Sequence, residues 1–181
     1  MNKKIQWITE TAIMLALLVA LQALTKPLGQ LVTGSCVNTV LAVSALVGGL
    51  GCGLTVAVIS PVLAFLLGIA SQVLTVPAIM AGNCVYVLLL SFLAVGKGRK
   101  LTKQLIGVAV SAAAKFAVLY GIIVCLVCGI FSETLLASGM LKAPMLKALP
   151  ATFSWPQLVT ALIGGTAALL ILPALRKALH K

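Results

Sequence analysis

Six long apolar runs, separated by short stretches of glycine, proline and basic residues, make up most of this sequence. Their lengths are close to the roughly 20 residues that an α-helix needs to cross the hydrocarbon core of a bilayer. Charged residues amount to 8% of the 181-residue chain, whereas a soluble domain carries roughly a quarter. The sequence therefore predicts an all-α membrane protein, a bundle of six transmembrane helices that forms one integral membrane domain over residues 1–181.

Backbone that is exposed to lipid must remain helical. We therefore place the ends of the expected spans at glycine, proline or charged residues. The first run follows two lysines, as in a signal peptide, but Glu10 interrupts it and further spans follow, so we expect it to be retained. The six expected spans are Ile5–Leu24, Leu31–Leu50, Leu54–Ile69, Val73–Val95, Leu105–Phe131 and Trp155–Leu175.

Basic residues, which give the chain a net charge of +11, indicate how the spans are oriented. With six spans, three basic clusters fall on one side of the membrane: Lys3 and Lys4; Lys97, Arg99, Lys100 and Lys103; and Arg176, Lys177 and Lys181. Loops rich in lysine and arginine stay in the cytoplasm, so we expect both termini to be cytoplasmic. Topology thus explains the charge, and the expected partner is the lipid bilayer and not nucleic acid.

The segment Ser132–Ser154, between the fifth and sixth spans, is too polar to cross the membrane. We expect it on the outside, as a loop, a lid or an interfacial helix over the bundle, with a plain connecting loop as the alternative. The loop Lys26–Gln30 and the turn at residues 70–72 are expected on the same side.

Groups for catalysis, metal binding or proton coupling are scarce. The acidic residues are Glu10 and Glu133, which are expected near opposite faces of the membrane, and the one histidine is His180. Cys125 and Cys128 form a CxxC without a second pair, so the five cysteines are interpreted as small buried thiols. No Walker-type ATP site is present. We therefore expect neither an enzyme nor a metal or cofactor site, and we expect any energy for transport to come from another subunit.

Lys115 lies midway along the fifth expected span, where a lysine costs roughly 3 kcal/mol and needs a partner. One interpretation is that it meets an anionic or carbonyl-bearing ligand, and the alternative is a structural lysine that caps carbonyls or snorkels. Buried amides can equally hold helices together, and Trp155 would also suit an interfacial anchor. The predicted substrate-binding residues are Lys115, Asn38, Met80, Asn83, Tyr86, Trp155 and Gln157.

The first span carries a small residue at every fourth position, Ala12, Ala16 and Ala20, a pattern that lets another helix approach closely. This stripe, the basic start, the six short spans and the ending PQLVTALIGGTAALLILPALRK at 156–177 together resemble a known family. The chain is similar to the S component, the substrate-binding membrane subunit of energy-coupling factor (ECF) transporters.

The resemblance implies that Ala12 and Ala16, with Ala20, dock on a membrane scaffold subunit that also joins two cytoplasmic ATPases. It also implies a binding site in the outer half of the bundle, covered by Lys26–Gln30 and Ser132–Ser154, for a vitamin or related micronutrient. Such proteins lie in the cell membrane of prokaryotes.

The substrate class is narrowed by what the chain lacks. The N-terminal histidine of the nickel and cobalt members is absent, and two Trp and two Tyr are few for stacking on a flavin-like ring. Lys115 and the scarcity of carboxylates favour a substrate with a carboxylate or several carbonyls over a cation. Two other classes stay open: a structural or assembly protein that binds no solute, and a small facilitator or channel.

Overall fold

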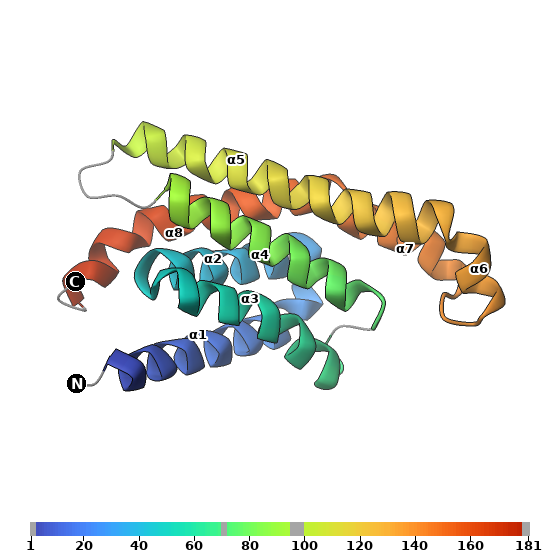
Figure 1. Cartoon of the computed structure of the whole chain (residues 1–181), viewed down its shortest axis with the longest axis horizontal. Helices are drawn as coiled ribbons and strands as arrows, with labels where there is room; N and C mark the ends of the chain where they lie inside the picture. Colours follow the sequence, from blue (N-terminus) through green and yellow to red (C-terminus); the bar gives the residue numbers. More distant parts are fainter. Residues whose placement is uncertain (1–2, 70–71, 95–99, 179–181) are drawn as a thin grey trace.

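The computed structural model describes residues 3–69, 72–94 and 100–178, which are helical almost throughout and contain no strand (Figure 1). Six helices in this part of the chain are long and apolar enough to cross a membrane, which confirms the expected all-α fold and number of spans. In chain order the elements are α1 (Lys3–Thr25), the short η1 (Lys26–Leu28), α2 (Gln30–Val47), α3 (Gly49–Leu66), α4 (Thr75–Leu93), α5 (Leu101–Leu119), its π-helical continuation η2 (Tyr120–Ile130), α6 (Ser132–Ala137), α7 (Ala143–Phe153) and α8 (Trp155–Ala178).

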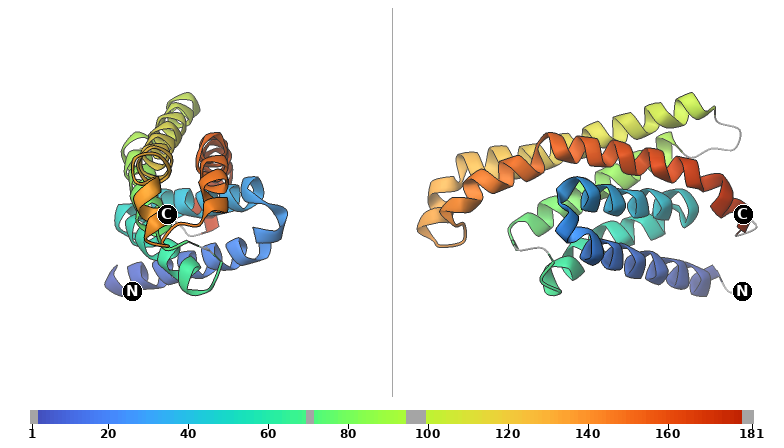
Figure 2. Two further views of the ribbon diagram at one scale, coloured as in Figure 1. Left: turned by 90° about the vertical axis from the view of Figure 1, so that its right-hand side faces the viewer. Right: turned by 180° about the vertical axis from the view of Figure 1, so that it is seen from behind.

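The buried core centres on α2, in which every residue from 40 to 46 is buried. A helix that is apolar all round is buried on all sides, and α2 fits this rule because α1, α3, α4 and α8 all contact it. α5 and α8 lie over α2 and α4, and α1 lies on the opposite side of the bundle (Figures 1 and 2). The contact between α2 and α8 is the most extensive in the molecule.

Glycine allows α2 and α8 to approach closely. A Cβ atom added at Gly164 of α8 would lie 2.6 Å from the Cβ of Asn38 and 2.7 Å from the backbone nitrogen of Thr39. Small residues at helix contacts are the usual way in which membrane helices pack without a hydrophobic driving force. This close approach brings Asn38 and the start of α8 together at the site described below.

Both termini lie at one end of the bundle, and α6 and α7 lie at the other end (Figures 1 and 2). Basic residues of the described part divide unevenly between these ends. Lys3 and Lys4 begin α1, Lys100 directly precedes α5 and Lys103 lies in its first turn, and Arg176 and Lys177 lie in the last turn of α8. Lys97, Arg99 and Lys181, which belong to the same predicted clusters, are outside the described residues. Most of the described basic residues therefore lie at the end of the bundle that holds the termini.

The segment Ser132–Ser154 is largely helical and folds back onto the bundle as α6 and α7. Leu149 and Phe153 of α7 are buried in a small second core with Leu119 and Ile123 of the long α5–η2 helix. η2 extends beyond the shorter helices and so presents an apolar surface that they do not cover. α7 packs along this surface of η2 (Figure 1).

The cysteines differ from the expectation of five buried thiols. Cys52 is buried, but Cys125 is exposed on η2, and the other three are half-buried. The expectation was wrong because, in a membrane bundle, an apolar side chain on the outer face meets lipid and has no need of the protein interior.

Candidate functional site

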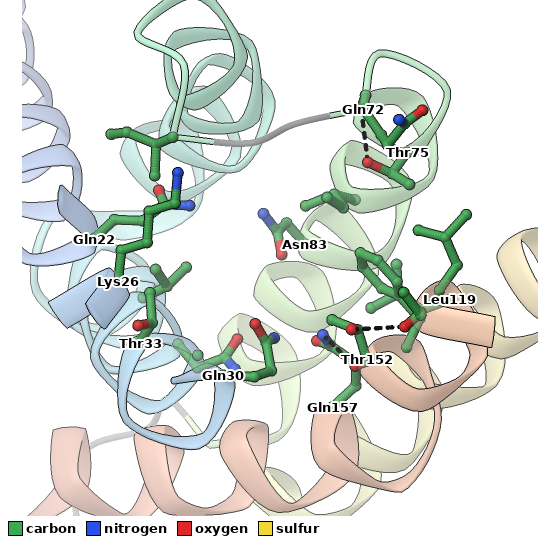
Figure 3. Close-up of a pocket in the computed structure, with 18 of the residues that line it drawn as sticks. Gln22, Lys26, Gln30, Thr33, Gln72, Thr75, Asn83, Leu119, Thr152 and Gln157 are labelled. Carbon is green, nitrogen blue, oxygen red and sulfur yellow. Dashed lines mark hydrogen bonds between the residues drawn. The ribbon is translucent and has the colours of Figure 1, made fainter. Parts of the chain in front are cut away.

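A cavity of about 430 Å³ lies between the helices (Figure 3). Residues of α7 line it, which places it toward the end of the bundle opposite the termini (Figure 1). Its volume falls within the range of small-molecule binding sites. The walls come from the end of α1, η1, the start of α2 and α4, the end of α5, and the helices α7 and α8. Segments that are far apart in the sequence therefore meet around one space.

Lys115 of α5 forms the floor of this cavity together with two asparagines. Its ammonium group donates hydrogen bonds to Oδ1 of Asn38 on α2, at 2.6 Å, and to Oδ1 of Asn83 on α4, at 2.7 Å. Lys115 is 3% exposed, and both asparagines are 1% exposed. The structure thus joins three of the predicted site residues, each from a different helix, in one buried cluster.

Tyr86 and Thr160 support this floor. The Lys115 ammonium lies 5.3 Å from the centre of the Tyr86 ring, within the range of a cation–π interaction. The Tyr86 hydroxyl donates to the backbone oxygen of Ala161, and Nδ2 of Asn38 donates to Oγ1 of Thr160, both on α8. Asn38 and Tyr86 are therefore held in place by α8.

The remaining wall divides into a polar and an apolar part. Amide and hydroxyl side chains form the polar part, and at its exposed rim Lys26 donates to the backbone oxygen of Gly68 at 3.2 Å. These polar lining residues are Gln22, Lys26, Gln30, Thr33, Gln72, Thr75, Thr152 and Gln157. The apolar lining residues are Val37, Ile69, Ile79, Leu119, Met145, Ala148, Leu149 and Phe153.

α7 forms one wall of the cavity and is tied to the rest of the bundle. The amide of Gln72 donates to the sulfur of Met145, and Nε2 of Gln157 donates to the backbone oxygen of Thr152. Gly139, with φ 71°, lies between α6 and α7, a backbone conformation that favours glycine. The predicted covering segment thus contributes side chains to the cavity, as does the segment Lys26–Gln30.

The other predicted site residues lie in different places. Gln157 lines the cavity, and Tyr86 lies behind Lys115 without lining it. Met80 is half-buried and Trp155 is 61% exposed, and neither borders the cavity. Trp155 is the first residue of α8 and points away from the bundle, which suits the alternative of an interfacial anchor.

Sequence reasoning missed most of the polar rim. Gln22, Gln30, Gln72, Thr33 and Thr75 each lie within a few residues of the end of an expected span. All of these ends were assigned to the same face of the membrane, so polar residues near the outer ends of several spans were the signal that could have found them.

The alanine stripe of α1 lies on the surface. Ala12, Ala16 and Ala20 are all exposed, and α1 is the least buried of the six candidate spans. This face is open to another helix or to lipid.

The cavity can bind, but its lining carries few groups for chemistry. Two ammonium groups line it, and its described lining contains no carboxylate, histidine or cysteine. No cluster of three or more metal-ligating side chains occurs within residues 3–69, 72–94 and 100–178. Comparison of the chain with family models, with curated proteins and with solved structures found no match.

Proposed function

We propose that this protein is the substrate-binding S component of an ECF-type importer and captures a vitamin or related micronutrient from outside a prokaryotic cell. The observation that carries the proposal is the cavity at one end of the six-helix bundle, with the buried ammonium of Lys115 at its floor. A charged side chain at this depth in a membrane protein is expensive and generally functional.

The distribution of charge supports the direction of capture. The basic residues that begin α1 and α5 and end α8 lie opposite the cavity. By the positive-inside rule this basic end is cytoplasmic, so both termini are inside and the cavity faces outward. A solute from outside then enters between α7 and the loop that follows α1.

The exposed face of α1 supports the proposed partner. Ala12, Ala16 and Ala20 leave a shallow strip on a helix that is otherwise little buried, and such strips let a second helix approach closely. The chain carries no Walker-type site, so the proposal assigns ATP hydrolysis to two cytoplasmic ATPases that are joined through the membrane scaffold subunit.

Assembly with the scaffold tests this function. We expect Ala16→Trp to abolish co-purification with a co-expressed scaffold and its ATPases, because the bulky ring fills the strip. Leu170→Trp is the matched control, because Leu170 is 74% exposed on α8, away from this face. Co-purification of the Ala16→Trp variant at the level of the control would contradict the proposed partner face, and wild-type protein that never co-purifies would contradict the importer.

One observation favours a second candidate, a structural membrane protein that binds no solute. The bonds of Lys115 to Asn38 and Asn83 connect α2, α4 and α5, as a purely structural crosslink would. Uptake of a solute that depends on the scaffold and the ATPases would exclude this candidate.

A further inference from the structure

The floor of the cavity offers hydrogen-bond donors that lack acceptors. The ammonium of Lys115 has three N–H groups, of which two are directed to Asn38 and Asn83. Asn83 accepts through Oδ1, while its amide nitrogen donates to no acceptor in the part of the chain that the structure describes. The Asn83 side chain points into the cavity from α4 (Figure 3). Both groups border the cavity, so a bound group can take the place of water as the acceptor of these hydrogen bonds.

The same floor lacks a negative charge. The partners of Lys115 are neutral amide oxygens and the ring of Tyr86, and the two acidic residues of the chain, Glu10 and Glu133, do not border the cavity. A buried charge is costly unless it is both hydrogen-bonded and paired. An anion at this point would supply the missing charge and the missing acceptors together.

We infer that the substrate is a compact, water-soluble carboxylic acid whose carboxylate binds at this floor; the inference rests on the proposed function and specifies its substrate. One carboxylate oxygen accepts from Nζ of Lys115 and the other from Nδ2 of Asn83. The two donors are adjacent, because Nδ2 belongs to the same amide as the Oδ1 atom that lies 2.7 Å from Nζ. A carboxylate has two acceptor oxygens on one carbon and can bridge such a pair.

The residues of the cavity walls indicate the chemical character of the acid beyond its carboxylate. Ile79, Leu119 and Phe153 offer an apolar surface near the floor, which suits a hydrocarbon or ring. The rim is polar, with Lys26 and Gln72, and a long alkyl chain that passed it would remove these polar groups from water, which is costly. Two ammonium groups in one cavity also raise the local concentration of anions. The occupant is thus a small acid with a polar outer end and not a lipid.

Three probes that share a benzene ring and differ in the charge of its substituent test the inference: benzoate, benzamide and benzylammonium. Each is titrated against the purified protein in detergent, and its dissociation constant is obtained from the rise in melting temperature. We expect benzoate to bind at least about tenfold more tightly than benzamide, since a hydrogen bond with a charged partner is the stronger one, and benzylammonium to give no shift. Equal binding of benzoate and benzamide, or any preference for benzylammonium, would overturn the inference. Decanoate binding more tightly than benzoate would assign the site to lipid and overturn it as well.

Two variants locate the binding at the floor. Lys115→Met should weaken benzoate binding about ten- to a hundredfold, whereas Lys147→Met, which removes an exposed lysine of α7 outside the cavity lining, should leave it unchanged. Asn83→Asp is the decisive variant, because it has the same shape and places a carboxylate beside Lys115. It should raise the melting temperature of the empty protein and abolish the shift with benzoate.

Benzoate binding to Asn83→Asp as tightly as to wild type would refute the proposed floor, even if Lys115→Met failed to fold. The result of the benzoate experiments can also be distinguished from the result of the assembly experiment that tests the proposed function. Benzoate binding without scaffold assembly would leave the carboxylate site standing and remove the importer, and assembly without a preference for benzoate would do the reverse.

Discussion

Replacing Gly164 by alanine tests whether the close packing of α2 on α8 builds the cavity floor. The added Cβ would lie 2.6 Å from the Cβ of Asn38 and 2.7 Å from the backbone nitrogen of Thr39, whereas ordinary contact begins at 3.4 Å. Since the second obstacle is backbone, no rotation of a side chain relieves it. The two helices must move apart by about 0.8 Å, and Asn38 moves with them.

The expected loss of folding stability is stated relative to a matched control, Gly121→Ala. Adding methyl groups to a tightly packed contact costs about 1–3 kcal/mol, while alanine in a helix gains about 1 kcal/mol over glycine. Gly121→Ala receives only that gain, because nothing lies within 4 Å of its added Cβ. Gly164→Ala should therefore be less stable than Gly121→Ala by about 1–3 kcal/mol, or about 2–12 °C in melting temperature for a chain of this size.

Thermal unfolding in detergent measures this difference, and titration with benzoate provides a second readout. We expect weaker benzoate binding by Gly164→Ala and unchanged binding by Gly121→Ala, because only the first displaces Asn38 from Lys115. Two variants with the same melting temperature and the same affinity would refute the reasoning from close packing.

Three further predictions concern other parts of the molecule. Tyr86→Phe removes the hydroxyl that bonds to α8 and should cost about 0.6–1.7 kcal/mol, the range for hydrogen bonds between membrane helices; no change in melting temperature would argue against that bond. Leu149→Ala, at a buried position of α7, should cost about 2 kcal/mol or more and speed the release of benzoate measured by stopped flow, and unchanged release would show that α7 does not cover the cavity. In intact cells that express a cysteine-free background, a membrane-impermeant maleimide should label Lys147→Cys but not Lys177→Cys, and the opposite pattern would reverse the proposed orientation.

The pattern of apolar runs was sufficient to predict six membrane-spanning α-helices, but the ends of these helices were less predictable. The fifth helix begins at Leu101 and not at Leu105, and the last helix continues past Leu175 to Ala178. Lysine, glutamine and arginine are good helix formers, so a helix continues through them after it has left the apolar layer. Hydropathy marks where a chain can meet lipid, and it does not mark where helical hydrogen bonding stops.

The floor of the site was predictable residue by residue, but not as a cluster. Lys115, Asn38 and Asn83 each stand out as polar residues within apolar runs. Their side chains meet because of the way α2, α4 and α5 pack against one another. The spacing of residues along a single helix does not reveal this packing. Met80 shows the converse, because it is three residues from Asn83 and yet does not border the cavity. Position along one helix is a poor guide to a cavity that is built between several.

Native mass spectrometry of the protein as isolated from its own cells tests the central claim, that the cavity floor binds a small acid, most directly. We predict that the wild-type protein carries a small, non-lipid molecule with a carboxylate, that Gly121→Ala carries the same mass, and that Lys115→Met carries none. A co-purified cation, a lipid, or the same bound mass in the wild type and in Lys115→Met would contradict the claim. So would a wild-type protein that carries no small molecule and is not stabilised by benzoate.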